Sequence, residues 1–182
     1  MLKFYRFSSK ISLMIAIACA DAKNGIGKDG KLLVSIPEDM KFFREATKDS
    51  VVIMGRKTLF SFKNKEPLKD RINVVLTNNP KKLIKEYKDY DNIFFVQNLT
   101  ELNEICKNYN DKKIFLIGGA SIYDTLIDFC NRCYITRLDK TFDADTFLPD
   151  LEERGFILES ESEEFTYKNI KYKFTSYIKK VN

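Results

Sequence analysis

The sequence predicts one α/β domain with a mixed, mostly parallel sheet. Its 182 residues are enough for a single domain with a full hydrophobic core. Short apolar runs alternate with helical patterns up to about residue 130, and regular alternation of this kind indicates parallel strands joined by right-handed crossovers. Beyond that point the apolar runs follow one another without helices between them, which predicts a C-terminal antiparallel hairpin.

The N-terminus has two interpretations. Residues 1–10, MLKFYRFSSK, are basic and free of acids, and residues 11–20, ISLMIAIACA, form an apolar run with an Ala-x-Ala ending. This outline matches a secretory signal or an organelle address, but it also matches a buried parallel strand. The turn-rich DAKNGIGKDG that follows is typical of a loop leaving a sheet. We therefore predict a strand over 11–20 in a domain spanning 11–182, with 1–10 a loose extension or the product of an upstream start codon.

The remaining elements follow from the same patterns. Buried strands are predicted at VVIM (51–54), INVVLT (72–77), IFFV (93–96) and KIFLIG (113–118), with helices near 57–62, 81–88, 99–108 and 120–129. Further strands are predicted at CYITRL (133–138), FILESES (156–162) and IKYKFTSYI (170–178). Apolar residues alternate with lysines from Ile170 to Phe174, as in a half-solvated antiparallel strand, and the hairpin is expected to turn near 167–169.

The stretch IPEDMKFFREAT (36–47) predicts a helix with one acid on its apolar side. Pro37 suits the first turn, where its missing N–H costs nothing. Steps of about 100° per residue place Asp39 inside the apolar arc and Glu38 on the opposite face. An inward carboxylate is costly unless a partner meets it. This stretch alone leaves open whether Asp39 is a structural acid, favoured by the helix dipole or paired with a core lysine, or a functional one.

The composition narrows the chemistry that is available. The chain has no histidine, so the commonest general base and metal ligand is missing, and catalysis must use carboxylates, a cofactor or a cysteine. Cys130 and Cys133 have zinc-like spacing, but Cys19 and Cys106 form no second pair, so we expect reduced thiols in a cytoplasmic protein and no metal. The net charge of +5 is modest, and neither a basic aromatic cluster nor a bilayer-length apolar run occurs, so we expect no nucleic-acid or membrane partner.

Two strand-to-helix junctions are candidate anion sites. In VVIMGRKT, Gly55, Arg56, Lys57 and Thr58 open a helix and combine free N–H groups, a helix dipole, two cations and a hydroxyl. In IFLIGGASIY, the glycines at 118–119 let a ligand approach the backbone. Each is a weak signal alone, and neither fits G-x-G-x-x-G or a P-loop. Because both lie at carboxyl ends of predicted strands, they together predict a ligand with two or more phosphate groups.

Seven segments in order give the chain a resemblance to the dihydrofolate reductase family. They are NGIGKDGKL, IPEDMKFF, VVIMGRKT, PLKDRINVVLT, IFLIGGASIY, CYITRLD and ADTFLP, and the likeness runs from Ile11 to about Lys180. The resemblance implies a mixed, mostly parallel eight-stranded sheet flanked by helices. It also implies an NADPH-dependent oxidoreductase, a monomer and an antifolate target, that reduces dihydrofolate to tetrahydrofolate in one-carbon metabolism.

The resemblance also assigns roles to single residues. Asp39 matches the acid that accepts paired hydrogen bonds from the 2-amino group and ring nitrogen of the pterin, and Thr136 matches the hydroxyl that supports this acid, so both are classed as catalytic. The family chemistry is hydride transfer from the nicotinamide to pterin C6, with a proton reaching N5 through water. Arg71 matches the arginine that grips the α-carboxylate of the folate tail with a bidentate fork.

Further positions carry over from the same motifs. The expected substrate-binding residues are Ile17, Ala18, Leu32, Val34, Asp39, Phe43, Leu68, Arg71, Ile117, Tyr123 and Thr136. The expected NADPH-binding residues are Cys19, Ile26, Gly27, Gly55, Arg56, Lys57, Thr58, Leu76, Thr77, Asn78, Ile117, Gly118, Gly119, Ala120, Ser121, Ile122, Tyr123 and Thr146. The family joins the glycine pair by a cis peptide bond, and GIGKDGKL (25–32) resembles the mobile loop that closes over its site.

The chain departs from the family pattern after this loop. Family members usually have Leu-Pro-Trp there, whereas this chain has Leu32, Leu33 and Val34 and contains no tryptophan. In the family the tryptophan flanks the pterin and helps to hold a water near the acid. We expect Leu32, Leu33 and Leu59 to fill the space, and we expect a slower hydride step with cofactor affinity largely intact.

Two alternative functions remain open at this point. The related pyrimidine reductase of riboflavin synthesis shares the fold and cofactor, but its phosphorylated substrate does not require Asp39 or Arg71. The second alternative is a catalytically weak nucleotide- or folate-binding member of the fold. A non-catalytic nucleotide-binding or scaffold protein would keep the glycine junctions without a reason to bury Asp39. Oxidation of NADPH with each substrate separates these alternatives.

Overall fold

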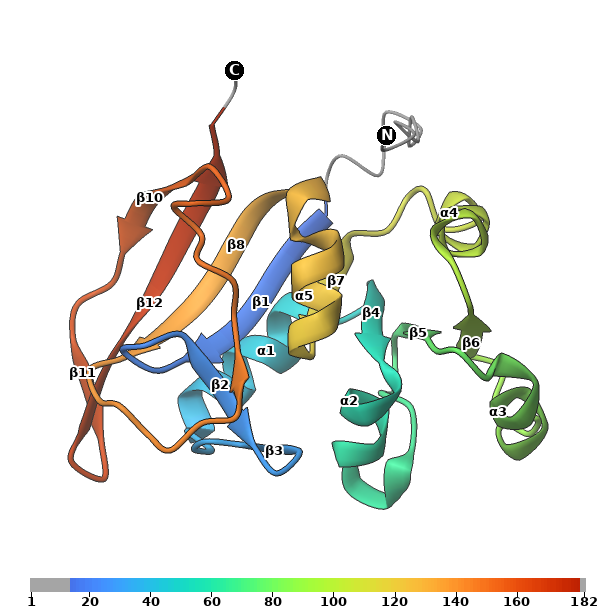
Figure 1. The fold of residues 1–182 in the computed structure, drawn as a ribbon, viewed down its shortest axis with the longest axis horizontal. Coiled ribbons are helices and arrows are strands. Elements are labelled where there is room, and N and C mark those ends of the chain that lie inside the picture. Colours follow the sequence, from blue (N-terminus) through green and yellow to red (C-terminus); the bar gives the residue numbers. More distant parts are fainter. Residues whose placement is uncertain (1–13, 181–182) are drawn as a thin grey trace.

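The computed structural model describes residues 14–180 as a central sheet with helices against it (Figure 1). The strands are β1 (Met14–Ala20), β2 (Gly25–Lys28), β3 (Lys31–Leu32), β4 (Val51–Gly55), β5 (Ile72–Leu76), β6 (Ile93–Val96), β7 (Ile114–Gly118), β8 (Cys130–Leu138), β9 (Thr146–Phe147), β10 (Phe156–Glu161), β11 (Phe165–Tyr167) and β12 (Ile170–Lys179). The helices are α1 (Pro37–Thr47), α2 (Arg56–Ser61), α3 (Pro80–Glu86), α4 (Leu99–Lys107) and α5 (Ala120–Leu126), with short 3-10 turns at η2 (Lys63–Lys65) and η3 (Ile127–Phe129). The predictions for residues 1–10 and 11–13 lie outside the described residues.

The main sheet confirms the predicted mixed, mostly parallel topology. Eight strands follow the order β10-β12-β8-β1-β7-β4-β5-β6, and β11 pairs with β12 beside this path. β1 is parallel to β7 and β8, and β4 is parallel to β5 and β7. β12 is antiparallel to β8 and β10. Because β1, β7 and β4 are neighbours, the loops at their carboxyl ends share one edge of the sheet.

The C-terminal hairpin turns where the sequence predicts it. β11 ends at Tyr167 and β12 begins at Ile170. The two residues between them, Lys168 and Asn169, have φ angles of 47° and 62°. Two consecutive left-handed residues match the twist of a tight two-residue hairpin, so the turn directs β12 back along β11.

A second, smaller sheet lies in a segment that the sequence predicts only as a loop. It has the order β3-β2-β9, and it pairs Gly25 with Phe147 and Gly27 with Thr146. Its strands have only two to four residues. Strands this short carry little periodic signal and depend on tertiary pairing, so the sequence pattern does not reveal them.

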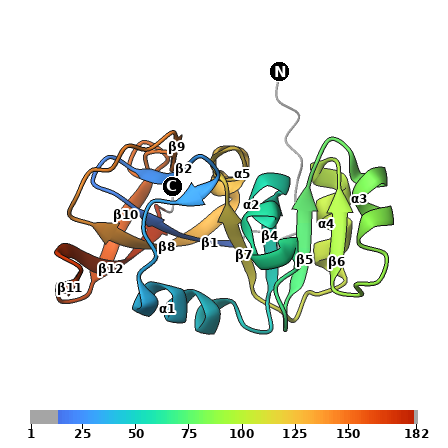
Figure 2. The same cartoon turned by 90° about the horizontal axis from the view of Figure 1, so that it is seen from below.

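Helices cover both faces of the main sheet (Figure 2). One core cluster packs the strands against α4 and α5, with Leu102 and Leu126 fully buried. The cluster on the other face packs the strands against α1, α2 and α3 through Phe43, Leu59 and Leu83. Successive side chains of a strand point to opposite faces, and both faces are covered, so the central strands are continuous apolar runs.

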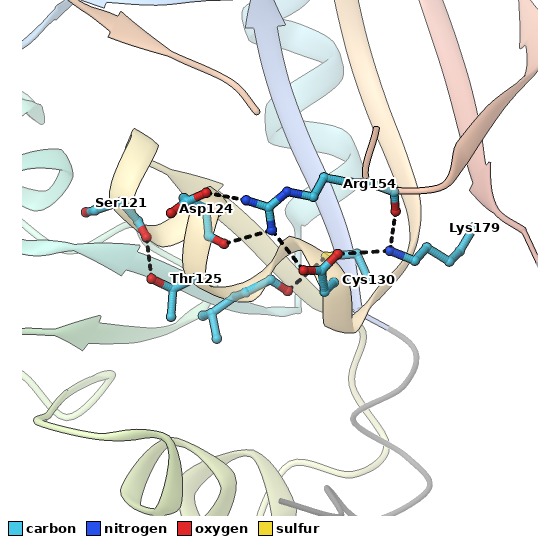
Figure 3. A network of polar contacts seen from close by, with 8 residues as sticks. Ser121, Asp124, Thr125, Cys130, Arg154 and Lys179 are labelled. Carbon is cyan, nitrogen blue, oxygen red and sulfur yellow. Dashed lines mark hydrogen bonds and ion pairs between the residues drawn. The ribbon is translucent and has the colours of Figure 1, made fainter. Parts of the chain in front are cut away.

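An ion-pair network fastens α5 to the C-terminal part of the chain (Figure 3). The Arg154 guanidinium pairs with Asp124 on α5 and lies 2.8 Å from Asp128. Lys179 on β12 lies 3.0 Å from the other Asp128 oxygen and donates to the Arg154 carbonyl at 2.5 Å. Burial would raise the pKa of Asp128, but Lys179 and Arg154 outweigh this effect and lower it. The network therefore holds the far end of the helix that begins at the glycine pair.

Two further observations concern a possible membrane span and the cysteine side chains. Within residues 14–180, no helix combines the length and the apolar character needed to cross a bilayer. The four cysteines are free thiols. Burial raises the pKa of Cys106 to about 12, so this side chain stays a neutral thiol at physiological pH.

Candidate active site

Asp39 is held between α1 and β8. Pro37 occupies the first turn of α1, as predicted, and Glu38 is exposed while Asp39 is half-buried. The hydroxyl of Thr136, on β8, donates to Asp39 Oδ1 at 2.5 Å. Thr136 is itself buried in β8, so its hydroxyl holds the Asp39 carboxylate in one position.

The electrostatics of Asp39 differ from those of an ordinary surface acid. Burial raises the pKa of Asp39, and the hydrogen bond from Thr136 offsets only part of this effect. Thr136 is the one side-chain donor to this carboxylate among the residues that the structure describes. Asp39 therefore has acceptor capacity left for a ligand, and a ligand with N–H donors would relieve the cost of its burial.

The apolar residues expected to line the pterin site divide between two core clusters. Ile17 on β1 and Ile117 on β7 belong to the same core cluster as Phe43 of α1 and Leu68, whereas the neighbouring Ala18 packs against the opposite cluster. The Tyr123 hydroxyl, on α5, donates to the Ile17 carbonyl at 2.6 Å. The structure thus places four of the predicted wall residues in one cluster.

The region of the missing tryptophan is packed differently from our expectation. Val34 packs in a small cluster with Cys19 and Phe142, while Leu59 is fully buried in the separate core beneath α1 and Leu32 is 57% exposed. Neither Leu32 nor Leu59 therefore joins the cluster of Val34, so the prediction is wrong for these two residues. Leu33 is half-buried and belongs to none of the three clusters, so its part in filling the space stays a prediction. The sequence shows that Leu32 and Leu59 are apolar, but it does not show which cluster each of them joins.

Arg71 lies at the other end of α1. Its Nε donates to the Thr47 hydroxyl at 2.9 Å, Nη2 donates to the Arg44 carbonyl at 3.1 Å, and Nη1 donates to the Lys69 carbonyl at 2.5 Å. A guanidinium has five N–H groups, so each Nη keeps one N–H without a partner among residues 14–180. Arg71 therefore has two N–H groups left that can donate to a ligand.

The two glycine junctions lie side by side. β4 and β7 are parallel neighbours, with Met54 paired to Gly118, and α2 and α5 begin directly after them. A Cβ added at Gly55 would lie 3.2 Å from Ile122, and one added at Gly119 would lie 3.7 Å from the Thr58 hydroxyl. The Gly118–Gly119 peptide bond is cis, as the resemblance implies. The first turns of both helices therefore open at one place on the sheet edge.

The remaining cofactor positions flank these junctions. Leu76 ends β5, and the Thr77 N–H donates to the Val96 carbonyl at 2.9 Å, which leaves Asn78 in the loop before α3. The Arg56 guanidinium lies 5.6 Å from the centroid of the Phe60 ring, one helical turn along α2. Lys57 is exposed beside Arg56, and Ala120 and Ser121 start α5.

The segment expected to close over the site is tied to the loop before β9. Ile26 and Gly27 lie on β2, where Gly27 pairs with Thr146. The Asp29 N–H donates to Asp145 Oδ2 at 2.9 Å, and the Asp145 N–H donates to the Gly27 carbonyl at 3.1 Å. These contacts tie the segment to the loop before β9.

Two buried polar side chains were missed by the sequence analysis. Asp21, after β1, is 1% exposed and accepts backbone N–H groups from Lys23, Gly25 and Phe142. Asn73 is fully buried in β5 and bonds the backbone of Leu68. A polar residue inside the apolar run INVVLT was the available signal for Asn73, whereas Asp21 lay in a stretch that indicated only a turn.

Known proteins resemble this chain over most of its length. A family model described as dihydrofolate reductase matches residues 12–179. The dihydrofolate reductase of Bacillus subtilis is 32% identical over 166 residues, which cover 90% of this chain and 93% of that protein. The enzyme of Heliothis virescens is 33% identical over 181 residues, covering 91% and 96%.

Two further matches extend the comparison. A bifunctional dihydrofolate reductase-thymidylate synthase of Daucus carota is 33% identical over 177 residues, and the chain spans 33% of its length. A dihydrofolate reductase from Enterococcus faecalis, solved with NADP(H) and RAB-propyl, has a TM-score of 0.74 and 27% identity, and the match covers 92% of this chain and 96% of that one. With the fold, the paired glycine junctions and an inward acid on α1 already in place, these matches show that the chain belongs to the dihydrofolate reductase family.

Proposed function

We propose that this protein reduces 7,8-dihydrofolate to tetrahydrofolate with NADPH. The observation that carries the proposal is the half-buried Asp39, whose only side-chain donor among the described residues is Thr136, at one end of α1 with Arg71 at the other. A pterin with a carboxylate-bearing tail offers N–H donors to Asp39 and a carboxylate to Arg71, so it would fit both ends of α1. Family membership and the named relatives support the reaction class.

Asp39 is the group that orients the pterin in this proposal. Its carboxylate accepts hydrogen bonds from the 2-amino group and the adjacent ring N–H, and charge-assisted bonds of this kind are about twice as strong as neutral ones. Thr136 holds the carboxylate in the required orientation, because its hydroxyl already donates to Oδ1. A negative charge close to the pterin also favours protonation of the ring at N5, and water delivers that proton.

The residues at the glycine junctions fit a dinucleotide. Gly118 has a φ of 105°, and a side chain at Gly55 would crowd Ile122, so glycine is needed at both positions and leaves the backbone open to a ligand. Arg56, Lys57 and the Thr58 hydroxyl surround the start of α2 and would hold the 2′-phosphate and pyrophosphate. NADPH bound there supplies a hydride for pterin C6.

Arg71 holds the tail carboxylate of the substrate. Three of its N–H groups are engaged by Thr47, Arg44 and Lys69, so the guanidinium plane is already oriented. The remaining pair of N–H groups forms the fork that binds a carboxylate. Pre-orientation lowers the entropy that the side chain loses on binding.

The first test is the oxidation of NADPH, followed by its absorbance, with dihydrofolate and then with the phosphorylated pyrimidine precursor of riboflavin. The proposal expects turnover with dihydrofolate alone. Turnover with the pyrimidine alone, or with neither compound, would contradict it.

Cofactor choice provides a second test. Loss of a charge-assisted hydrogen bond costs about 1.5–3 kcal/mol, so Arg56→Ala should reduce the preference for NADPH over NADH by roughly one to two decades. Lys107→Ala, an exposed charge change on α4, is the control and should leave the preference unchanged. Equal losses for both cofactors in Arg56→Ala would place Arg56 away from the 2′-phosphate.

A further inference from the structure

Asn73 is buried, and its side-chain amide hydrogen-bonds to the backbone of one short segment, residues 68–71. It lies in β5 between Ile72 and Val74 and is fully buried. Its Oδ1 accepts the Leu68 N–H at 3.0 Å, and its Nδ2 donates to the Leu68 carbonyl at 2.9 Å and to the Arg71 carbonyl at 3.3 Å. One amide therefore bonds both ends of the segment 68–71.

Asn92, just before β6, repeats the same bonds from a second direction. Its Nδ2 donates to the Leu68 carbonyl and to the Arg71 carbonyl, each at 3.1 Å. The Asn92 carbonyl accepts the Asn73 backbone N–H at 2.8 Å and lies 3.2 Å from Asn73 Nδ2, whose two hydrogens are thus shared among three carbonyls. The two asparagines thus support each other, and both carbonyls of the segment accept two side-chain donors.

The segment held in this way carries two predicted substrate contacts. The Leu68 side chain packs in the core cluster that also contains Phe43. The Arg71 side chain leaves the segment toward α1 and bonds Thr47 and the Arg44 carbonyl. A shift of the 68–71 backbone would move both contacts together relative to α1.

We propose that Asn73 and Asn92 are positioning residues for the carboxylate-bearing tail of the substrate. They set where Leu68 and Arg71 meet this tail and do not contact the reacting pterin ring. This inference rests on the proposed function, because it assumes that the substrate is dihydrofolate. An apolar residue would satisfy the packing of β5, whereas the two asparagine side chains together contact the Leu68 and Arg71 backbones and hold this segment in place.

The test compares two ligands in Asn92→Ala. Calorimetric titration without NADPH gives the Kd of dihydrofolate and of a dihydropterin that lacks the tail. Asn92→Ala should weaken dihydrofolate binding about tenfold and should leave the tail-less pterin within about twofold of the parent. Asn73→Leu, which keeps roughly the same volume and removes the side-chain donors without burying a charge, should show the same selective loss. In steady state, the KM for dihydrofolate should rise while kcat stays near that of the parent.

The matched control is Asn98→Ala. Asn98 caps α4 by accepting the Glu101 N–H at 3.0 Å, so this variant also loses an asparagine hydrogen bond but has no contact with the segment 68–71. It should lower the melting temperature and weaken neither ligand.

Three outcomes separate the two proposals. Equal weakening of both ligands in Asn92→Ala, or no weakening of either, would overturn the positioning role. If Asn92→Ala does not fold, Asn92→Ser, which is closer in polarity, carries the same comparison. A parent protein that does not bind dihydrofolate would overturn the proposed function itself, and this inference with it.

Discussion

Asp21 and Asp39 are both withdrawn from solvent, but the chain surrounds them in opposite ways. Asp21 Oδ1 accepts the N–H groups of Lys23 and Gly25 at 2.8 and 2.7 Å, and its Oδ2 accepts the Phe142 N–H at 2.9 Å. Asp39 accepts one side-chain bond, from Thr136, within residues 14–180. The protein supplies the hydrogen-bond donors that the Asp21 carboxylate needs, whereas the Asp39 carboxylate can accept further hydrogen bonds.

The two pKa shifts follow from this difference. For Asp21, burial alone would raise the pKa, but the three backbone N–H groups outweigh it and lower the pKa. For Asp39, burial also raises the pKa, and the bond from Thr136 is too little to reverse it. The number of donors therefore distinguishes a carboxylate that the protein itself satisfies from one that, in the proposed function, is kept for a ligand.

The largest expected effect is that of Asp39→Asn on turnover. The variant keeps the side-chain volume and loses the charge that orients the pterin, so turnover of dihydrofolate near neutral pH should fall by about a hundredfold or more. Its free energy of unfolding should rise, because an uncompensated buried charge is gone. Steady-state NADPH oxidation and urea unfolding measure the two effects. Near-parental turnover would make Asp39 a structural acid like Asp21.

Asp21→Asn should have the opposite effect on stability. An asparagine can keep the bonds from Lys23 and Gly25 on its oxygen, but its amide nitrogen then faces the Phe142 N–H. Leaving this buried donor unsatisfied should lower the free energy of unfolding by about 2 kcal/mol. Urea denaturation compares both variants with the parent. A variant as stable as the parent would show that Asp21 is not held by this network.

The pH dependence of stability should separate the same two acids. Because the pKa of Asp39 is raised, its contribution is present below the unfolded value of about 3.9 and is lost as the pH rises through the folded pKa. Because the pKa of Asp21 is lowered, its contribution is present above about 3.9 and is lost as the pH falls through the folded pKa. Relative to the parent, Asp39→Asn should gain stability with rising pH, and Asp21→Asn should lose least in acid. Parallel curves for the two variants would contradict this assignment.

The smallest expected effect is that of Val34→Trp. Val34 is half-buried in the cluster with Cys19 and Phe142, so a tryptophan there overpacks this cluster and should destabilise the protein by about 1 kcal/mol. Single-turnover hydride transfer and a melting curve are measured for the parent and the variant. A variant that transfers hydride faster without losing stability would show that a gap exists beside the pterin.

The comparison also shows what the sequence could predict. The position of Asp39 followed from local rules, because Pro37 starts the helix and the helical period turns the acid inward. The two glycine junctions could be predicted from the sequence for the same reason, since each is a short motif directly after a strand.

Asp21 and the small sheet were not predictable in this way. The third donor to Asp21 comes from Phe142, 121 residues away, and β2 finds its partner β9 equally far along the chain. Such pairings are set by tertiary packing and leave no local pattern. The cluster around Val34 was missed for a related reason, because an apolar residue does not reveal which of several clusters it joins.

The most direct measurement is an NMR titration of the aspartate carboxyl carbons in the free protein and in the complex with dihydrofolate, with Asp39→Asn and Asp21→Asn identifying the two signals. The account predicts that the pKa of Asp39 lies above about 3.9 in the free protein and falls when the pterin supplies the missing N–H donors, while the pKa of Asp21 stays low in both states. An Asp39 signal that titrates at its ordinary value, or that does not change on binding, would contradict the claim that this carboxylate is kept for the substrate.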